Sequence, residues 1–289
     1  MAKAHIHQIF TDEASRDAID PAFIPLDHTS RERADWQEYW PIRKALHAAS
    51  LQPGELHPGE LHPGAHYGFL TSRFKPEADV AAAEMAAFVG LVGDGYDVIN
   101  FTPFPDQHAL FWNVFEHGEY QLPGHAALCQ QVIAALELKA DVTELVMDSR
   151  NSIFRTYFTA KPAFWEKWLA LADKLVALAD VDGPLRGPLN ATLPVRADLP
   201  GLLTGQAKVA VMERIAPLVL ALDPELKAVS FNPFQRPRTR SPFAEFPFEA
   251  VLSDALKIAY SVRGDPLYKS AFGEVRAQVQ KAMQAKAGG

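Results

Sequence analysis

Short segments rich in β-branched and aromatic residues alternate with helical segments along most of this chain. The expected strands are residues 5–10, 23–26, 66–74, 96–102, 152–160 and 226–231. Between them, residues 78–92 and 124–138 carry apolar side chains at helical spacing, and Pro162 opens another long helical stretch. Strands separated by helices favour a parallel sheet, because a parallel connection must cross over, usually through a helix. The sequence therefore predicts an α/β fold with a mostly parallel sheet, helices on both faces and further helices at the C-terminal end.

Composition narrows the class of protein. Apolar residues make up 48% of the 289 residues, which is enough for a sizeable core. The net charge of −7 argues against general nucleic-acid binding, which needs a basic surface. The single cysteine, Cys129, excludes a disulfide framework within the chain. Residues 1–12 are polar and no apolar run is long enough to span a bilayer, so we expect a cytoplasmic protein without a transmembrane segment.

Two segments are expected to be irregular. Residues 51–65 repeat a five-residue unit three times, and its Pro-Gly pairs predict an exposed loop of little functional weight. Its histidines allow a metal-binding interpretation, although slippage of a short repeat in a tolerant loop explains them more simply. Residues 180–205 are rich in glycine, proline and leucine without a clear period, which indicates either a lid or an irregular packed segment.

The densest group of polar side chains lies in residues 94–119, where an expected strand ends and a helix begins. Asp106 and His108 follow the prolines that stop the strand. Ligands of open α/β sheets bind outside the carboxyl ends of the strands, so these two residues are candidates for a site. The alternative for Asp106 is a helix cap, and Glu116 and His117 could simply face solvent.

Several familiar catalytic motifs are absent from the sequence. There is no glycine-rich phosphate loop, no Gly-x-Ser-x-Gly elbow and no cysteine pair for zinc. Carboxylates and histidine at strand ends remain, and they suit a hard cation such as Mn²⁺ or Mg²⁺ together with a substrate diphosphate.

The order of blocks resembles that of bacterial GT-A glycosyltransferases of capsule and lipopolysaccharide synthesis, and especially one poorly characterised branch. The resemblance covers roughly residues 5–232 and lies in the segments HIHQIF (5–10), IPLD (24–27), WQEYWPIR (36–43), YGFLTSRF (67–74), YDVI (96–99), FTAKPAFW (158–165) and MERI (212–215). It implies a GT-A-like, Rossmann-like transferase domain over residues 1–235 and a helical extension over residues 236–289.

The resemblance also implies roles for individual residues. Glu213 would be the general base on the acceptor hydroxyl, although a surface charge paired with a neighbour is the alternative. The residues expected to hold the nucleotide-sugar are Gln8, Phe10, Asp12, Arg43, Arg73, Arg155 and Lys161. Residues 94–119 have no Asp-x-Asp, the usual metal site of these enzymes, and Asp106-Gln-His108 is the nearest spacing there. Arg73, Arg150, Arg155 or Lys161 could therefore neutralise the diphosphate in place of a metal.

The resulting hypothesis is that the protein transfers a sugar from a nucleotide-sugar to a polysaccharide or lipid-linked glycan. Peripheral association with a membrane is compatible with this hypothesis. One alternative is a metal-dependent hydrolase of a phosphate or sugar ester that uses Asp106, His108, Glu116 and His117. Another is a carbohydrate-binding domain that kept the fold without catalysis.

Overall fold

The centre of the molecule is a six-stranded sheet. The structure is a computed structural model that describes residues 1–50, 61–196, 205–239 and 241–287. The strand order is β2-β1-β3-β5-β4-β6. The strands are β1 (Ala4–Phe10), β2 (Ile24–Asp27), β3 (His66–Leu70), β4 (Val98–Asn100), β5 (Phe158–Ala160) and β6 (Ala228–Ser230). Only β5 runs antiparallel to its neighbours among these strands, which confirms the predicted α/β class with a mostly parallel sheet.

Strands β4 and β5 are three residues each, shorter than the segments predicted for them. Asn100 explains the end of β4. Its side-chain amide donates to the carbonyls of Ser149 and Ser152, at 2.9 and 3.1 Å, and its amide oxygen accepts from the Thr102 N–H at 2.9 Å. These side-chain bonds replace ladder bonds just beyond the strand, so the chain leaves the sheet there.

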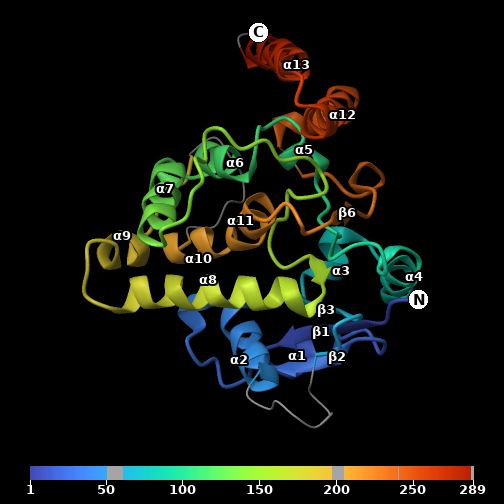
Figure 1. Cartoon of the computed structure of the whole chain (residues 1–289), viewed down its shortest axis with the longest axis vertical. Coiled ribbons are helices and arrows are strands. Elements are labelled where there is room, and N and C mark those ends of the chain that lie inside the picture. Colours follow the sequence, from blue (N-terminus) through green and yellow to red (C-terminus); the bar gives the residue numbers. More distant parts are fainter. Residues whose placement is uncertain (51–60, 197–204, 240, 288–289) are drawn as a thin grey trace.

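Helices cover both faces of the sheet, as the sequence predicts. Alternate side chains of one strand serve the two cores, because Val98 packs in the larger core and Ile99 in the smaller one. The larger core holds the inner faces of α2 (Tyr39–Ser50) and of α8 (Pro162–Asp180), the long helix that crosses the middle of Figure 1. The smaller core holds α3 (Phe74–Ala78) and α4 (Ala82–Val92).

The remaining helices lie mainly in the second half of the chain. They are α1 (Glu13–Asp17), η1 (Ala34–Trp36), α5 (Pro105–His108), α6 (Val114–Gln121), α7 (His125–Ala135), α9 (Arg186–Asn190), α10 (Ala207–Met212), α11 (Ile215–Leu222), η2 (Pro233–Gln235), η3 (Pro242–Glu245), α12 (Pro247–Arg263) and α13 (Pro266–Ala287). Helices α10 and α11 are separated by a short break. Pro217 has no N–H to donate to the Glu213 carbonyl, and the break falls at Glu213 and Arg214.

Helices α12 and α13 pack against each other at one end of the molecule (Figure 1). Buried Lys257 ties α12 to the rest of the chain, because its Nζ donates to the carbonyls of His108 and Phe111 at 2.8 and 2.9 Å. On α13, buried Phe272 packs on Trp112 at a ring-centroid distance of 4.1 Å. The division between residues 1–235 and 236–289 stays a prediction, and these contacts show how the two segments meet.

The two segments predicted to be irregular are only partly described. Most of the repeat at 51–65 and residues 197–204 of the expected lid lie outside the described residues. Within 180–196 the chain forms the short helix α9.

Candidate functional site

A two-part cleft lies at the edge of the sheet where β1, β3 and β4 end. Its larger part, the main cleft, has a volume of about 520 Å³, and the adjoining side pocket has about 270 Å³. Residues Gln37, Glu38 and Arg73 line both parts. Because β5 is antiparallel, its amino end lies at this same edge, and Arg155 and Tyr157 just before it also line the main cleft.

One wall of the main cleft is charged and tightly hydrogen-bonded. Glu213 accepts from the Arg155 backbone N–H at 2.9 Å and from the Arg214 guanidinium at 2.7 Å. Glu77 accepts from the Tyr157 hydroxyl at 2.7 Å and pairs with Arg155 Nε at 3.2 Å. Burial raises the pKa of Glu213, but Arg214 and Arg155 together outweigh it and hold the pKa below the usual range of a glutamate. Glu213 is therefore an ionised carboxylate in the cleft.

Two charged groups of the cleft have no such partner. Among the described residues, neither the Arg73 guanidinium nor the Glu38 carboxylate makes a side-chain hydrogen bond or ion pair with another residue. Burial raises the pKa of Glu38, and the hydrogen bond from its own backbone N–H, together with the more distant Arg155 and Arg73, only partly offsets it. A free cation and a free carboxyl group thus stand where the main cleft meets the side pocket. The sequence analysis missed Glu38, because nothing marks it within the aromatic segment of residues 36–43.

Another wall of the main cleft is aromatic. Phe111, Tyr120 and Phe243 form a triangle of rings with centroid distances of 5.3 to 5.4 Å. His117 continues this wall, because its ring lies edge-on to Phe111 at 5.0 Å and to Phe154 at 4.9 Å. The cleft thus combines flat apolar surface with charged side chains, which is suited to a ligand with both apolar faces and hydroxyl or phosphate groups.

Strained backbone is concentrated around the cleft. Gln37, Phe104 and Arg155 line the main cleft with φ values of 51°, 65° and 56°, and Arg31 lines the side pocket with a φ of 49°. A non-glycine residue in this left-handed region costs about 1–3 kcal/mol, and such residues cluster at functional sites. Their position supports a binding role for the cleft.

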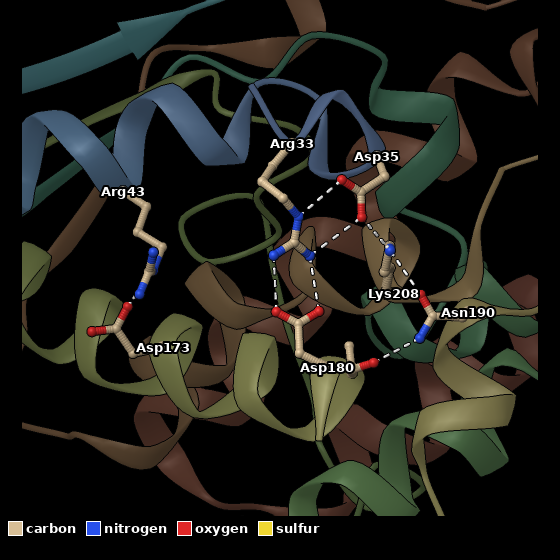
Figure 2. Close-up of polar contacts among 8 residues, drawn as sticks. Arg33, Asp35, Arg43, Asp173, Asp180, Asn190 and Lys208 are labelled. Carbon is tan, nitrogen blue, oxygen red and sulfur yellow. Dashed lines mark hydrogen bonds and ion pairs between the residues drawn. The ribbon is translucent and has the colours of Figure 1, made fainter. Parts of the chain in front are cut away.

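A network of charges fixes the segment that carries Glu38 (Figure 2). Arg33 makes two hydrogen bonds of 2.8 Å with Asp180 at the end of α8 and one of 3.2 Å with Asp35. The Nζ of Lys208 on α10 donates to Asp35 at 2.5 Å and to Asn190 of α9 at 2.8 Å. Lys208 is only 3% exposed. The wall segment is therefore tied to three helices from the second half of the chain.

The structure brings together four of the residues predicted for the site. Arg73, Asp106, Arg155 and Glu213 all line the main cleft, the first two from the N-terminal half and Glu213 from the break between α10 and α11. His108 does not line it.

The residues predicted on β1 lie on the other side of the strand from the side pocket. Ile9 and Thr11 line the pocket, whereas the predicted Gln8, Phe10 and Asp12 do not. Gln8 and Phe10 are buried, and Asp12 caps α1 by accepting from the Ser15 N–H at 2.8 Å. Side chains alternate between the two faces of a strand, so an error of one residue in phase moves the whole prediction to the wrong face.

Arg43 and Lys161 lie away from the cleft. Arg43 pairs with Asp173 of α8, in the larger core layer (Figure 2). Lys161 follows β5 and pairs with Asp97 at 3.4 Å, just before β4. Because β5 is antiparallel, its carboxyl end lies at the opposite edge of the sheet from the cleft. Lys161, which was predicted to help hold the nucleotide-sugar, therefore lies at the opposite edge of the sheet from Arg73.

Asp106 and His108 do not fit a pair of metal ligands. The Asp106 carboxylate accepts from the Thr239 N–H at 3.1 Å, from the Thr239 hydroxyl and from the Ser241 hydroxyl at 2.7 Å. The buried ring of His108 packs against Phe234, and burial lowers its pKa to about 3. In the part of the chain that the structure describes, no three His, Cys, Asp or Glu side chains form a metal-binding group.

The residues named for the hydrolase alternative do not meet at one site, because each of them contacts other side chains. Glu116 pairs with Arg276 at 2.5 Å and accepts from the Trp112 N–H at 2.6 Å. His117 lines the main cleft, but its ring is held between Phe111 and Phe154. These side chains and Asp106 are therefore each engaged with separate partners.

Comparisons with protein-family models, curated proteins and solved structures found no match to this chain. Within the described residues, no helix is both long and apolar enough to cross a membrane.

Proposed function

We propose that the protein is a GT-A-type glycosyltransferase that moves a sugar from a nucleotide-sugar to a polysaccharide or lipid-linked glycan. The observation that carries the proposal is the two-part cleft at the carboxyl edge of the sheet, with unpaired Arg73 between its parts. A nucleotide-sugar has two bulky ends joined by a diphosphate, and the cleft offers two hollows joined by a cation. The position at strand ends is also where open α/β sheets bind ligands.

Each part of the cleft has a role in this proposal. The nucleoside occupies the side pocket beside Thr11, His28 and Arg31. Arg73 binds the diphosphate and stabilises the negative charge that develops on it as it leaves the sugar. A guanidinium can make two parallel bonds to phosphate oxygens, so it serves this role without a metal ion. No step of the proposed reaction passes through Mn²⁺ or Mg²⁺, because Asp106 and His108 do not fit such a site.

The acceptor lies in the main cleft between the aromatic wall and Glu213. The ring triangle supplies flat surface for a sugar ring, and the carboxylate of Glu213 accepts the proton of the attacking hydroxyl. The same proton is lost as the new glycosidic bond forms and the bond to the diphosphate breaks. Arg155 and Arg214 keep Glu213 ionised before the reaction, which leaves it able to accept a proton.

One observation favours a second candidate, a carbohydrate-binding domain without catalysis. Both carboxylate oxygens of Glu213 already accept hydrogen bonds, and its lowered pKa makes it a weaker base than an ordinary glutamate. The aromatic wall would bind sugar in either case. Nucleotide binding separates the two candidates, because a simple carbohydrate-binding domain has no use for a diphosphate.

The test is a thermal-shift titration with uridine, guanosine and adenosine diphosphates, with and without a chelator. A ligand at a hundred times its Kd stabilises a protein by about 2.7 kcal/mol. At roughly 2–4 °C per kcal/mol, the expected rise in Tm is about 5–10 °C. The rise should be lost in Arg73→Ala and kept in Arg263→Ala, which removes an exposed arginine from the end of α12. If no diphosphate raises the Tm of the native chain, the transferase proposal fails and the binding-domain candidate gains.

A further inference from the structure

We propose that Glu38 takes up a proton when a diphosphate-bearing ligand binds beside Arg73, so that the cleft binds the anion and the proton together. The inference rests on the proposed function, because it takes a nucleoside diphosphate as the ligand. It adds a property of the site that the proposed reaction does not require, namely a linkage between ligand affinity and pH.

The position of Glu38 is the first support. It is the one carboxyl-bearing residue that lines both the main cleft and the side pocket among the described residues, and Arg73 lines both parts with it. A ligand that spans the two parts must therefore pass Glu38 as well as Arg73. Its phosphate oxygens would approach a carboxylate that carries the same sign of charge.

The contrast with the neighbouring Glu213 is the second support. Glu213 accepts from the Arg155 N–H and from the Arg214 guanidinium, and these donors stabilise its charged form. Among the described residues, Glu38 accepts only from its own backbone N–H, so its charge is easier to neutralise. Burial already raises the pKa of Glu38 in the empty cleft, and a nearby anion shifts it in the same direction.

The charges that face Glu38 come from several elements. Arg73 precedes α3, Arg155 precedes β5 and Glu213 follows α10, and these three act on Glu38 electrostatically. On the side-pocket side stand Arg31 and His28, and burial lowers the pKa of that histidine, so it is largely neutral at pH 7. A bound diphosphate would engage Arg73 and thereby weaken one of the two cations that favour ionised Glu38. Protonation of Glu38 then removes the remaining repulsion and supplies an O–H that donates to a phosphate oxygen.

The rigidity of the backbone is the third support. Residue Gln37, directly before Glu38, is held in the left-handed region, and Tyr39 directly after it is buried. The network of Arg33, Asp35 and Lys208 anchors the same segment to α8, α9 and α10 (Figure 2). The backbone therefore keeps Glu38 beside the ligand, where protonation of its carboxylate relieves the repulsion.

The experiment is calorimetric titration of the diphosphate that gives the largest thermal shift, in two buffers of different ionisation enthalpy, at pH values from 6 to 8. The native chain should take up a proton near pH 7, and its affinity should fall by up to about tenfold per pH unit as the pH rises. Glu38→Gln should take up less, by the part that Glu38 contributes, and should bind more tightly than the native chain at pH 8. The control Glu166→Gln removes an exposed carboxylate of α8 and should match the native chain.

The ligand also titrates, so the difference between the native chain and Glu38→Gln is the quantity that decides. Equal proton uptake in both would overturn the role of Glu38 while the transferase proposal stands. Absence of binding to the native chain would refute the transferase proposal and this inference with it. If Glu38→Gln does not fold, Glu38→Ala and Glu38→Ser are measured in its place, with circular dichroism to establish folding.

Discussion

The buried amine of Lys208 offers the clearest test of how the cleft is held together. Lys208→Met keeps an unbranched side chain of similar volume but removes Nζ, which lies 5.1 Å from the centre of the Trp36 ring. It removes the bonds to Asp35 and Asn190. Breaking a fully buried ion pair by removing one partner costs about 3–5 kcal/mol. Asp35 is a third exposed and keeps Arg33, so we expect the lower value of about 2–3 kcal/mol.

The assay is urea unfolding together with the Tm from calorimetry. At roughly 2–4 °C per kcal/mol, the Tm should fall by about 4–12 °C. Lys44→Met is the matched control, because Lys44 and Glu32 form an exposed pair, and its effect should stay below about 1 kcal/mol. The double variant Asp35→Asn with Lys208→Met should lose less stability than the two single variants together. A Lys208→Met protein as stable as the native chain would refute the reasoning.

Three further predictions concern the site and the C-terminal helices. Glu213→Gln should lower the rate of sugar transfer by about a hundredfold or more and leave the diphosphate affinity unchanged, as kinetics and calorimetry would show; an equal loss of affinity would point to a binding role instead. Asp106→Asn should lower the free energy of unfolding by about 1–3 kcal/mol, because Thr239 and Ser241 lose a charged hydrogen-bond acceptor. An unchanged urea midpoint would contradict this. Burial lowers the pKa of Lys257 to about 8, so the unfolded chain binds more protons between about pH 8 and 10.5. The contribution of Lys257 to stability should therefore rise with pH over that range, and urea unfolding should show a smaller rise in Lys257→Met than in the native chain.

Local patterns in the sequence predicted the elements but not the direction of every strand. The strand at 5–10 and the helix opened by Pro162 were found at the expected places, whereas the strand expected over 66–74 ends at Leu70. The antiparallel direction of β5 depends on which strands it joins, and no short stretch of sequence carries that information. The misplacement of Lys161 follows from it directly, because reversing a strand exchanges the two edges of the sheet.

Two residues predicted for the site, Arg73 and Glu213, line the cleft. Arg73 follows the end of β3, and Glu213, which only the family resemblance pointed to, lies at the break before α11. On β1 the prediction was wrong by one position, because Ile9 lines the side pocket and Gln8 and Phe10 point to the other face of the strand. Glu38 could not be found, because its importance comes from the absence of a partner, and only a three-dimensional arrangement reveals which charges remain unpaired.

The place of β5 in the sheet has a consequence for the order of folding. On one side β5 pairs with β3, where Tyr67 faces Ala160, and on the other with β4, where Ile99 faces Thr159. It is therefore the strand that joins β2-β1-β3 to β4-β6. Its pairing with β3 spans about 90 residues of chain, and such distant pairings form slowly because a long loop must close first. During synthesis, the first 150 residues leave the ribosome with β3 lacking its partner on one side and β4 lacking its partners on both sides. The cleft can thus form only after β5 has emerged and closed the sheet.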